Sequence, residues 1–72
     1  YNNGGEMMIF KQVTFVPVNR HCVTLKPIQY NIDTVFDDSA RKKAQSLLDL
    51  EKYAERYQLE SIIDFELHHH VC

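Results

Sequence analysis

The sequence predicts a single small α+β domain, with a three-stranded, mostly antiparallel sheet and one helix packed on one face. Three observations predict this fold: two apolar segments open the chain, an amphipathic segment follows, and an alternating segment ends it. A chain of 72 residues holds one domain, and its core alone gives marginal stability. Chains of this size often gain the rest from a disulfide, a metal or a partner subunit.

The first two segments predict a β-hairpin. Residues 8–18 read MIFKQVTFVPV, which is rich in β-branched and aromatic residues, and residues 21–30 predict a second strand. Asn19 and Arg20 form a turn-prone break, so the loop is expected to span about two to four residues. Because Pro27 cannot donate a ladder hydrogen bond, the second strand is expected at an edge of the sheet.

Residues 1–7 are expected to form a flexible leader, and residues 8–72 the domain. The favoured interpretation is a cloning remnant ahead of a natural start at Met7 or Met8, because the periodic pattern begins at Met8. The alternative is that the chain is a piece of a longer protein.

Residues 40–57 predict a helix, because apolar side chains recur at spacings of three and four with no glycine or proline between them. Asp37, Asp38 or Ser39 is expected to cap its first turn. The apolar stripe consists of Ala40, Ala44, Leu47, Leu50, Ala54 and Tyr57, and Leu48 widens it.

Residues 60–72 read ESIIDFELHHHVC and predict a third strand with one apolar and one polar face. The residues expected on the inner face are Ile63, Phe65, Leu67 and Val71. Those expected on the outer face are Asp64, Glu66, His68, His70 and Cys72.

The element order β-β-α-β makes the helix a crossover connection, which is expected to be right-handed. The third strand is then expected beside the first, which gives the strand order 2-1-3. Under the helix we expect Ile9, Val13, Phe15, Val23, Leu25, Ile63, Phe65 and Leu67. On the outer face we expect Phe10, Gln12, Thr14, Val16, Thr24, Lys26, Glu66 and His68.

The composition and the absence of known motifs limit the classes of function that the sequence supports. A formal charge of −2, with no long run of one sign, gives no strong attraction to nucleic acid or to a membrane surface. No segment approaches the ~20 apolar residues of a membrane span, and two cysteines do not make a disulfide scaffold, so we expect a soluble, cytoplasmic protein. The sequence contains no Gly-rich phosphate loop, Gly-x-Ser-x-Gly elbow or His-Glu-x-x-His motif. We therefore expect no enzyme, no catalytic residues and no cofactor.

The leading hypothesis is a non-enzymatic protein–protein interaction or regulatory module. Several apolar residues are expected on the outer sheet face, which a single helix cannot cover, so this face or an edge strand is expected to meet another protein or a second copy in a homodimer. The predicted contact residues are Phe10, Thr14, Val16, Glu66, His68 and His70.

The first alternative is a zinc-like divalent metal site. Alternate residues of a strand point the same way, so a His-x-His pair with a carboxylate or thiolate can converge on one ion. The predicted ligands are Glu66, His68, His70 and Cys72. Cys22 begins the second strand at the opposite end of the sheet, about 20–30 Å away, so a bridge between the two cysteines is not expected.

The second alternative is a nucleic-acid contact through the basic cluster at the start of the helix, Arg41, Lys42 and Lys43. Cations at this end of a helix oppose its dipole, which makes the cluster notable. No aromatic residue interleaves with it, and no nucleic-acid-binding motif surrounds it.

Overall fold

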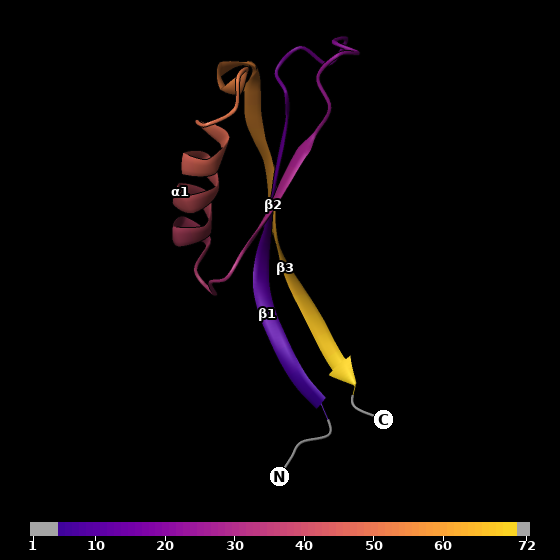
Figure 1. Cartoon of the computed structure of the whole chain (residues 1–72), viewed down its shortest axis with the longest axis vertical. Coiled ribbons are helices and arrows are strands. Elements are labelled where there is room, and N and C mark those ends of the chain that lie inside the picture. Colours follow the sequence, from indigo (N-terminus) through magenta and orange to yellow (C-terminus); the bar gives the residue numbers. More distant parts are fainter. Residues whose placement is uncertain (1–4, 71–72) are drawn as a thin grey trace.

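The computed structural model describes the backbone of residues 5–70 and the side chains of residues 9–65. Its sheet has the strand order β2-β1-β3, and β1 runs antiparallel to both neighbours (Figure 1). The predicted α+β class and the order 2-1-3 are therefore confirmed. The elements are β1 (Gly5–Pro17), β2 (Ile28–Ile32), α1 (Asp37–Leu48), the 3₁₀ turn η1 (Ala54–Arg56) and β3 (Tyr57–His70).

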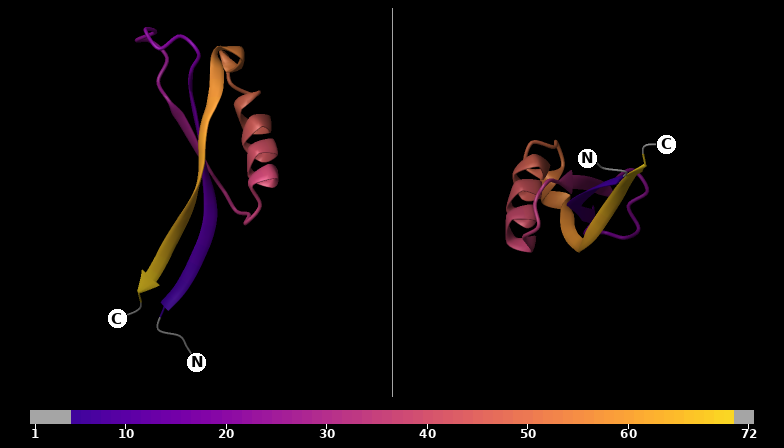
Figure 2. Two further views of the ribbon diagram at one scale, coloured as in Figure 1. Left: turned by 180° about the vertical axis from the view of Figure 1, so that it is seen from behind. Right: turned by 90° about the horizontal axis from the view of Figure 1, so that it is seen from below.

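The helix covers one face of one half of the sheet. Since β2 and β3 are each antiparallel to β1, they are parallel to each other, and α1 connects them across one face of the sheet (Figure 2). The ribbon formed by β1 and β3 extends beyond both α1 and β2, which gives an elongated molecule of 50 × 23 × 18 Å (Figure 1). No helix in the described part of the chain has the length and apolar character needed to span a membrane.

The core lies between α1 and one face of the sheet, and its buried strand residues come from β1 and β2. Alanines on the helix allow its backbone to approach the sheet closely, and Phe15 packs edge-to-face on Tyr30 with ring centroids 6.1 Å apart. The buried apolar residues are Val13, Phe15, Ile32, Ala40, Ala44 and Leu48, each no more than 5% exposed.

The predicted hairpin with a short loop is wrong. β1 ends at Pro17 and β2 begins only at Ile28, after an irregular connection. Asn19 turns this connection, because its side chain accepts a hydrogen bond from the backbone N–H of His21. Val23, which was expected in the core, lies in the connection and is 88% exposed.

At its other end β1 begins at Gly5, inside the stretch predicted as a leader, whereas residues 1–4 lie outside the described part.

The helix begins earlier than predicted. Phe36 is the N-cap residue, with an extended backbone and no side-chain capping bond, and the predicted cap at Asp37, Asp38 or Ser39 is wrong. Asp37 and Asp38 instead lie in the first turn, where their carboxylates interact favourably with the helix dipole.

The helix also ends earlier, at Leu48, although no glycine or proline stops it. The chain must reach the sheet by Tyr57, whose backbone pairs with Pro17, and this long-range pairing overrides the helical periodicity. As a result Leu48 is buried in place of the predicted Leu47 and Leu50, which are 42% and 81% exposed.

The predicted faces of β3 are inverted, because the strand contains a bulge. Thr14 pairs with Ser61 and Phe15 with Leu59, so Glu60 is an extra residue on β3. An extra residue shifts every following side chain to the opposite face. Ile62 consequently packs against the core, and Ile63 and Phe65 lie on the face opposite the helix.

We predict that Leu48→Ala destabilises the fold by about 2–5 kcal/mol, because it leaves a cavity under the helix. Leu50→Ala removes the same atoms from an exposed position and should change stability by no more than about 0.5 kcal/mol. Urea unfolding followed by circular dichroism measures both. Equal effects would contradict the assignment of Leu48, rather than Leu50, to the core.

Candidate functional site

The sheet face opposite α1, here called the outer face, contains no charged residue among the paired strand positions with described side chains. Residues that are partners in an antiparallel pair share a face, so the strand register defines the outer face. Its members are Phe10, Gln12, Thr14 and Val16 of β1, Gln29 and Asn31 of β2, and Gln58, Ser61, Ile63 and Phe65 of β3. This is notable in a chain of which 25% of the residues are charged.

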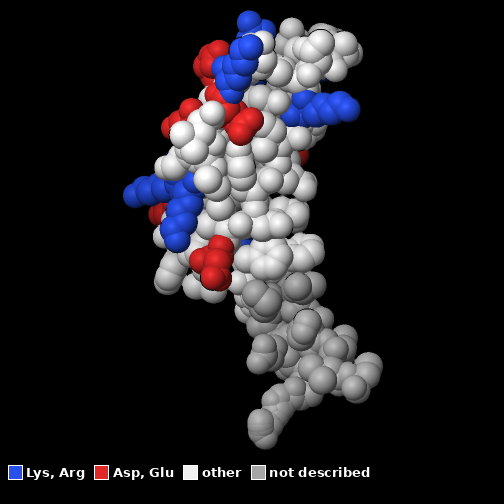
Figure 3. Space-filling model, in the orientation of Figure 1, with Lys and Arg blue, Asp and Glu red and all other residues white. Residues whose placement is uncertain are grey.

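An apolar group, here called the outer cluster, occupies this face and consists of Phe10, Ile63 and Phe65. Phe10 and Phe65 are register partners, and their ring centroids lie 4.9 Å apart at an interplanar angle of 39°. Ile63 is 48% exposed and Phe65 is 38% exposed. In the space-filling view the charged side chains gather over α1 and the upper end of the molecule, and the adjoining strand region is mostly uncharged (Figure 3).

The predicted partner-binding residues of β1 lie on the outer face, but they differ in accessibility. Phe10 and Val16 are half-buried, whereas Thr14 is only 7% exposed between its register partners Gln29 and Ser61. Thr14 therefore offers little contact area.

Sequence reasoning missed Ile63 and Phe65 as outer-face residues. The predicted alternation of β3 residues between the two faces was correct, but the faces were assigned the wrong way round. The sequence did contain one signal for the correct assignment, which was Lys11. Alternation along β1 places Lys11 on the same face as Val13 and Phe15, so its charge needs an acidic partner on the inner face.

Glu66, His68 and His70 are placed by backbone register alone. Their partners on β1 are Ile9, Met7 and Gly5 respectively. Their side chains lie outside the described residues, so their role in partner binding stays a prediction.

The predicted metal ligands are Glu66, His68, His70 and Cys72; the first three have undescribed side chains, and Cys72 lies outside the described residues altogether. Among the residues that the structure does describe, no group of three His, Cys, Asp or Glu side chains is arranged to hold a metal ion.

The basic residues Arg41, Lys42 and Lys43 are exposed on α1. Consecutive helical residues point in different directions, so the three do not form one flat patch. Arg41 also lies 3.9 Å from the carboxylate of Asp38, one turn earlier. A nucleic-acid contact through these residues stays a prediction.

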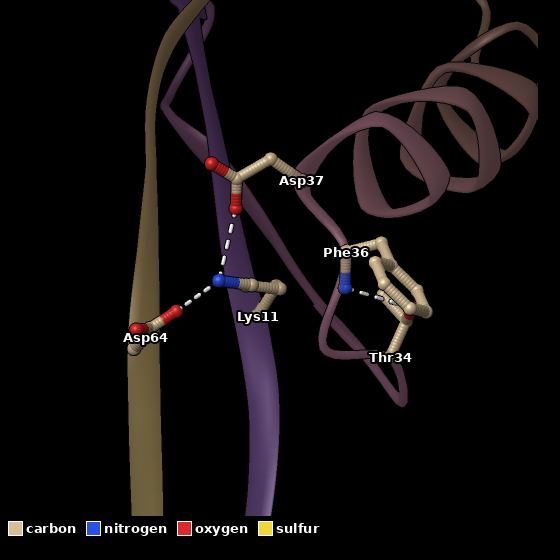
Figure 4. A network of polar contacts seen from close by, with 5 residues as sticks. All are labelled: Lys11, Thr34, Phe36, Asp37 and Asp64. Carbon is tan, nitrogen blue, oxygen red and sulfur yellow. Dashed lines mark hydrogen bonds and ion pairs between the residues drawn. The ribbon is translucent and has the colours of Figure 1, made fainter.

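A buried cation determines which side of β3 faces the helix. The Lys11 side chain is 11% exposed, and its Nζ lies 2.9 Å from Asp37 Oδ1 and donates a hydrogen bond to Asp64 (Figure 4). The two carboxylates are each 68% exposed and remain hydrated. The hydrogen bond to Asp64, followed by that to Asp37, raises the pKa of Lys11 above its ordinary value. This network connects the first residue of α1 to both long strands.

Cys22 is a half-buried thiol in the connection between β1 and β2. Its Sγ lies 3.3 Å from Thr24 Oγ1, at the edge of a hollow that Pro17, Leu25 and Arg56 also line. The side-chain hydrogen bond with Thr24, helped by the backbone N–H groups of Leu25 and Thr24, lowers the pKa of Cys22. The local structure thus favours the thiolate.

Comparisons of this chain with protein-family models, with curated proteins and with solved structures find no match. Its function is therefore inferred from the geometry described above.

We predict that Lys11 makes the fold sensitive to alkaline pH. A raised pKa means that the stabilisation is fully present below about pH 10.4 and is lost as the pH rises through the folded-state pKa. The melting temperature of the wild-type protein should therefore fall more steeply than that of Lys11→Met between about pH 9.5 and 11.5. Burial raises the pKa of Tyr30 and adds a loss in the same pH range to both proteins, so the difference reports Lys11. Parallel melting curves would show that the ion network contributes nothing.

We predict that the alkylation rate of Cys22 rises with a pH midpoint below that of the same thiol in the unfolded chain. The measurement follows the iodoacetamide reaction rate against pH in a Cys72→Ser background. Thr24→Val removes the first hydrogen-bond partner and should move the midpoint upward. The urea-unfolded protein supplies the reference, and a midpoint equal to it would refute the assignment.

Proposed function

We propose that this chain is a small non-enzymatic protein–protein interaction module that self-associates through its outer face. The observation that carries the proposal is the outer cluster, which leaves Ile63 and Phe65 partly exposed on a face whose paired, described positions carry no charge. Charged residues are depleted in the same way at the centres of protein interfaces, where aromatic residues are enriched.

The outer cluster has no cover within the described chain. The helix α1 lies on the opposite face, and one helix cannot cover both (Figure 2). Exposed apolar surface costs about 25 cal/mol per Å², so covering it with a partner is favourable. Because Phe10 and Phe65 already stack on each other, the patch is preformed and loses little side-chain freedom on binding.

A second copy of the chain is the occupant that best fits this face. In a two-fold interface the same patch meets itself, so a charge close to the axis would face its own copy. The paired positions of the outer face that the structure describes include no such charge, although the chain as a whole has a formal charge of −2. Two sheets can pack face to face about 10 Å apart, with Gln12, Gln29 and Asn31 available for hydrogen bonds around the apolar centre.

A non-enzymatic role is consistent with the chemistry of this face. Its paired, described positions are amides, hydroxyls and apolar groups, and none supplies a carboxylate, an imidazole or a thiol. Such a face favours binding over acid–base or nucleophilic catalysis.

The test is the mass of the protein in solution. Ile63→Thr and Phe65→Thr keep a residue suited to a strand but remove apolar surface, and each should weaken association about tenfold or more. Size exclusion with light scattering over a concentration series measures this change. Leu50→Thr is the matched control, because it removes exposed apolar surface from the turn that follows α1 and should leave association unchanged.

A wild-type protein that stays monomeric up to about millimolar concentration would overturn the proposed self-association. Association that Ile63→Thr and Phe65→Thr leave unchanged would overturn the role of the outer face. A monomer that captures another protein, and loses it in both variants, would replace the second copy with a different partner.

A further inference from the structure

We infer that the free edge of β3 pairs antiparallel with the same edge of a second copy, about a two-fold axis at Leu67. This inference rests on the self-association proposed above and adds a second contact on a different surface. It would extend the three-stranded sheet of each copy into a continuous six-stranded sheet.

β3 presents a long edge that is free over the described chain. It has 14 residues, and along residues 5–70 it pairs with β1 on one side and with no strand on the other. Natural edge strands are protected by charged side chains, above all lysine, and by proline, bulges or short length. β3 contains no lysine, arginine or proline, and its bulge at Glu60 lies near the beginning, so the stretch from Ser61 to His70 runs without one.

The other edge of the sheet is protected. β2 has only five residues, and Pro27 immediately precedes it. Short length and a neighbouring proline are two of the devices that prevent edge pairing. The two edges therefore differ in the way expected if one edge is used for pairing and the other is not.

The ribbon beyond the helix also favours a further strand. Pairing with β2 stops at Lys11, so β1 and β3 continue alone toward Gly5 and His70 (Figure 1). A two-stranded ribbon is only marginally stable in water. Pairing β3 with its copy would give four strands at the centre of the assembly, where each ribbon alone has two.

The order of residue types along β3 selects both the direction and the register. In antiparallel self-pairing, each residue faces the one equally far beyond the centre. A centre at Leu67 sets the positions of Asp64 and Glu66 opposite those of His70 and His68, and no other centre gives both acids a histidine. Carboxylate opposite an N–H donor is favourable, whereas in-register parallel pairing would set acid opposite acid. Asp64 remains 68% exposed beside Lys11 and is accessible to a partner.

The two contacts are geometrically compatible. The edge contact has its two-fold axis perpendicular to the sheet, and the outer-face contact has its axis parallel to the sheet. Perpendicular two-fold axes that intersect generate a closed tetramer with D2 symmetry. The assembly would then be two six-stranded sheets packed through their outer faces.

The first experiment is cross-linking in a Cys22→Ser and Cys72→Ser background, checked for folding by circular dichroism. Directly opposite residues in an antiparallel pair have Cα atoms about 4.5–5.5 Å apart, within the range of a disulfide. Leu67→Cys should therefore form a covalent dimer under mild oxidation. Leu59→Cys is the control, because in this register the two copies of Leu59 lie about 50 Å apart across the edge contact.

The second experiment is a swap across the proposed pair. Glu66→Lys and His68→Glu should each weaken edge association about tenfold, because each puts like charges or unmatched groups opposite each other. The double variant restores opposite charges across the two-fold axis and should recover the association. Additive losses in the double variant would overturn the register.

The outcomes separate this inference from the proposed function. If both hold, Phe65→Thr converts a tetramer into a dimer and the Leu67→Cys cross-link persists. If the protein associates but Leu67→Cys forms no cross-link, the edge inference is overturned and the outer-face proposal stands. If the cross-link forms while Phe65→Thr leaves the mass unchanged, the edge contact is supported and the outer-face proposal is overturned.

Discussion

Lys11 lies on the same face of β1 as Val13 and Phe15, so its charge falls at the lower border of the core. A buried ammonium is tolerated only beside carboxylates, and Asp37 and Asp64 provide them. Asp64 can reach Lys11 only if this part of β3 turns its even-numbered residues toward the helix. Ile63 and Phe65 must then point the other way, and the exposed outer cluster follows from the neutralisation of one lysine.

The bulge at Glu60 reconciles the two halves of β3. Tyr57 packs on the core, and Asp64 reaches Lys11 on the same face of the sheet. The two residues are an odd number of positions apart, so regular alternation would put them on opposite faces. One extra residue on β3 corrects the phase. A strand without that residue would bring Ile63 and Phe65 under the helix and would leave Lys11 without a second carboxylate.

The fold class and strand order could be predicted because they depend on patterns that span many residues: a β-rich start, a helical stripe and an alternating end. The sequence predictions failed where a single residue or a long-range contact determines the local structure. The face that each residue of β3 occupies depends on one bulged residue, and no local sequence pattern indicates that bulge. The end of α1 depends on the pairing of Tyr57 with Pro17, and the start of β2 depends on the pairing of Ile28 with Phe15. Phe10 was predicted at the candidate site because it belongs to β1, whose parity was correct, and Ile63 and Phe65 were missed because β3 was inverted.

The same inversion links folding to association. Of the four phenylalanines in the chain, only Phe15 lies in the core, while Phe10 and Phe65 stack on the outer face. The helix contributes two alanines and one leucine to the core, so the apolar surface buried within one copy is small. Any partner that binds only the folded chain stabilises it by mass action. If a second copy covers the outer cluster, the apolar surface that β3 turns away from the core is buried after all, and the stability of this small domain becomes dependent on its own concentration.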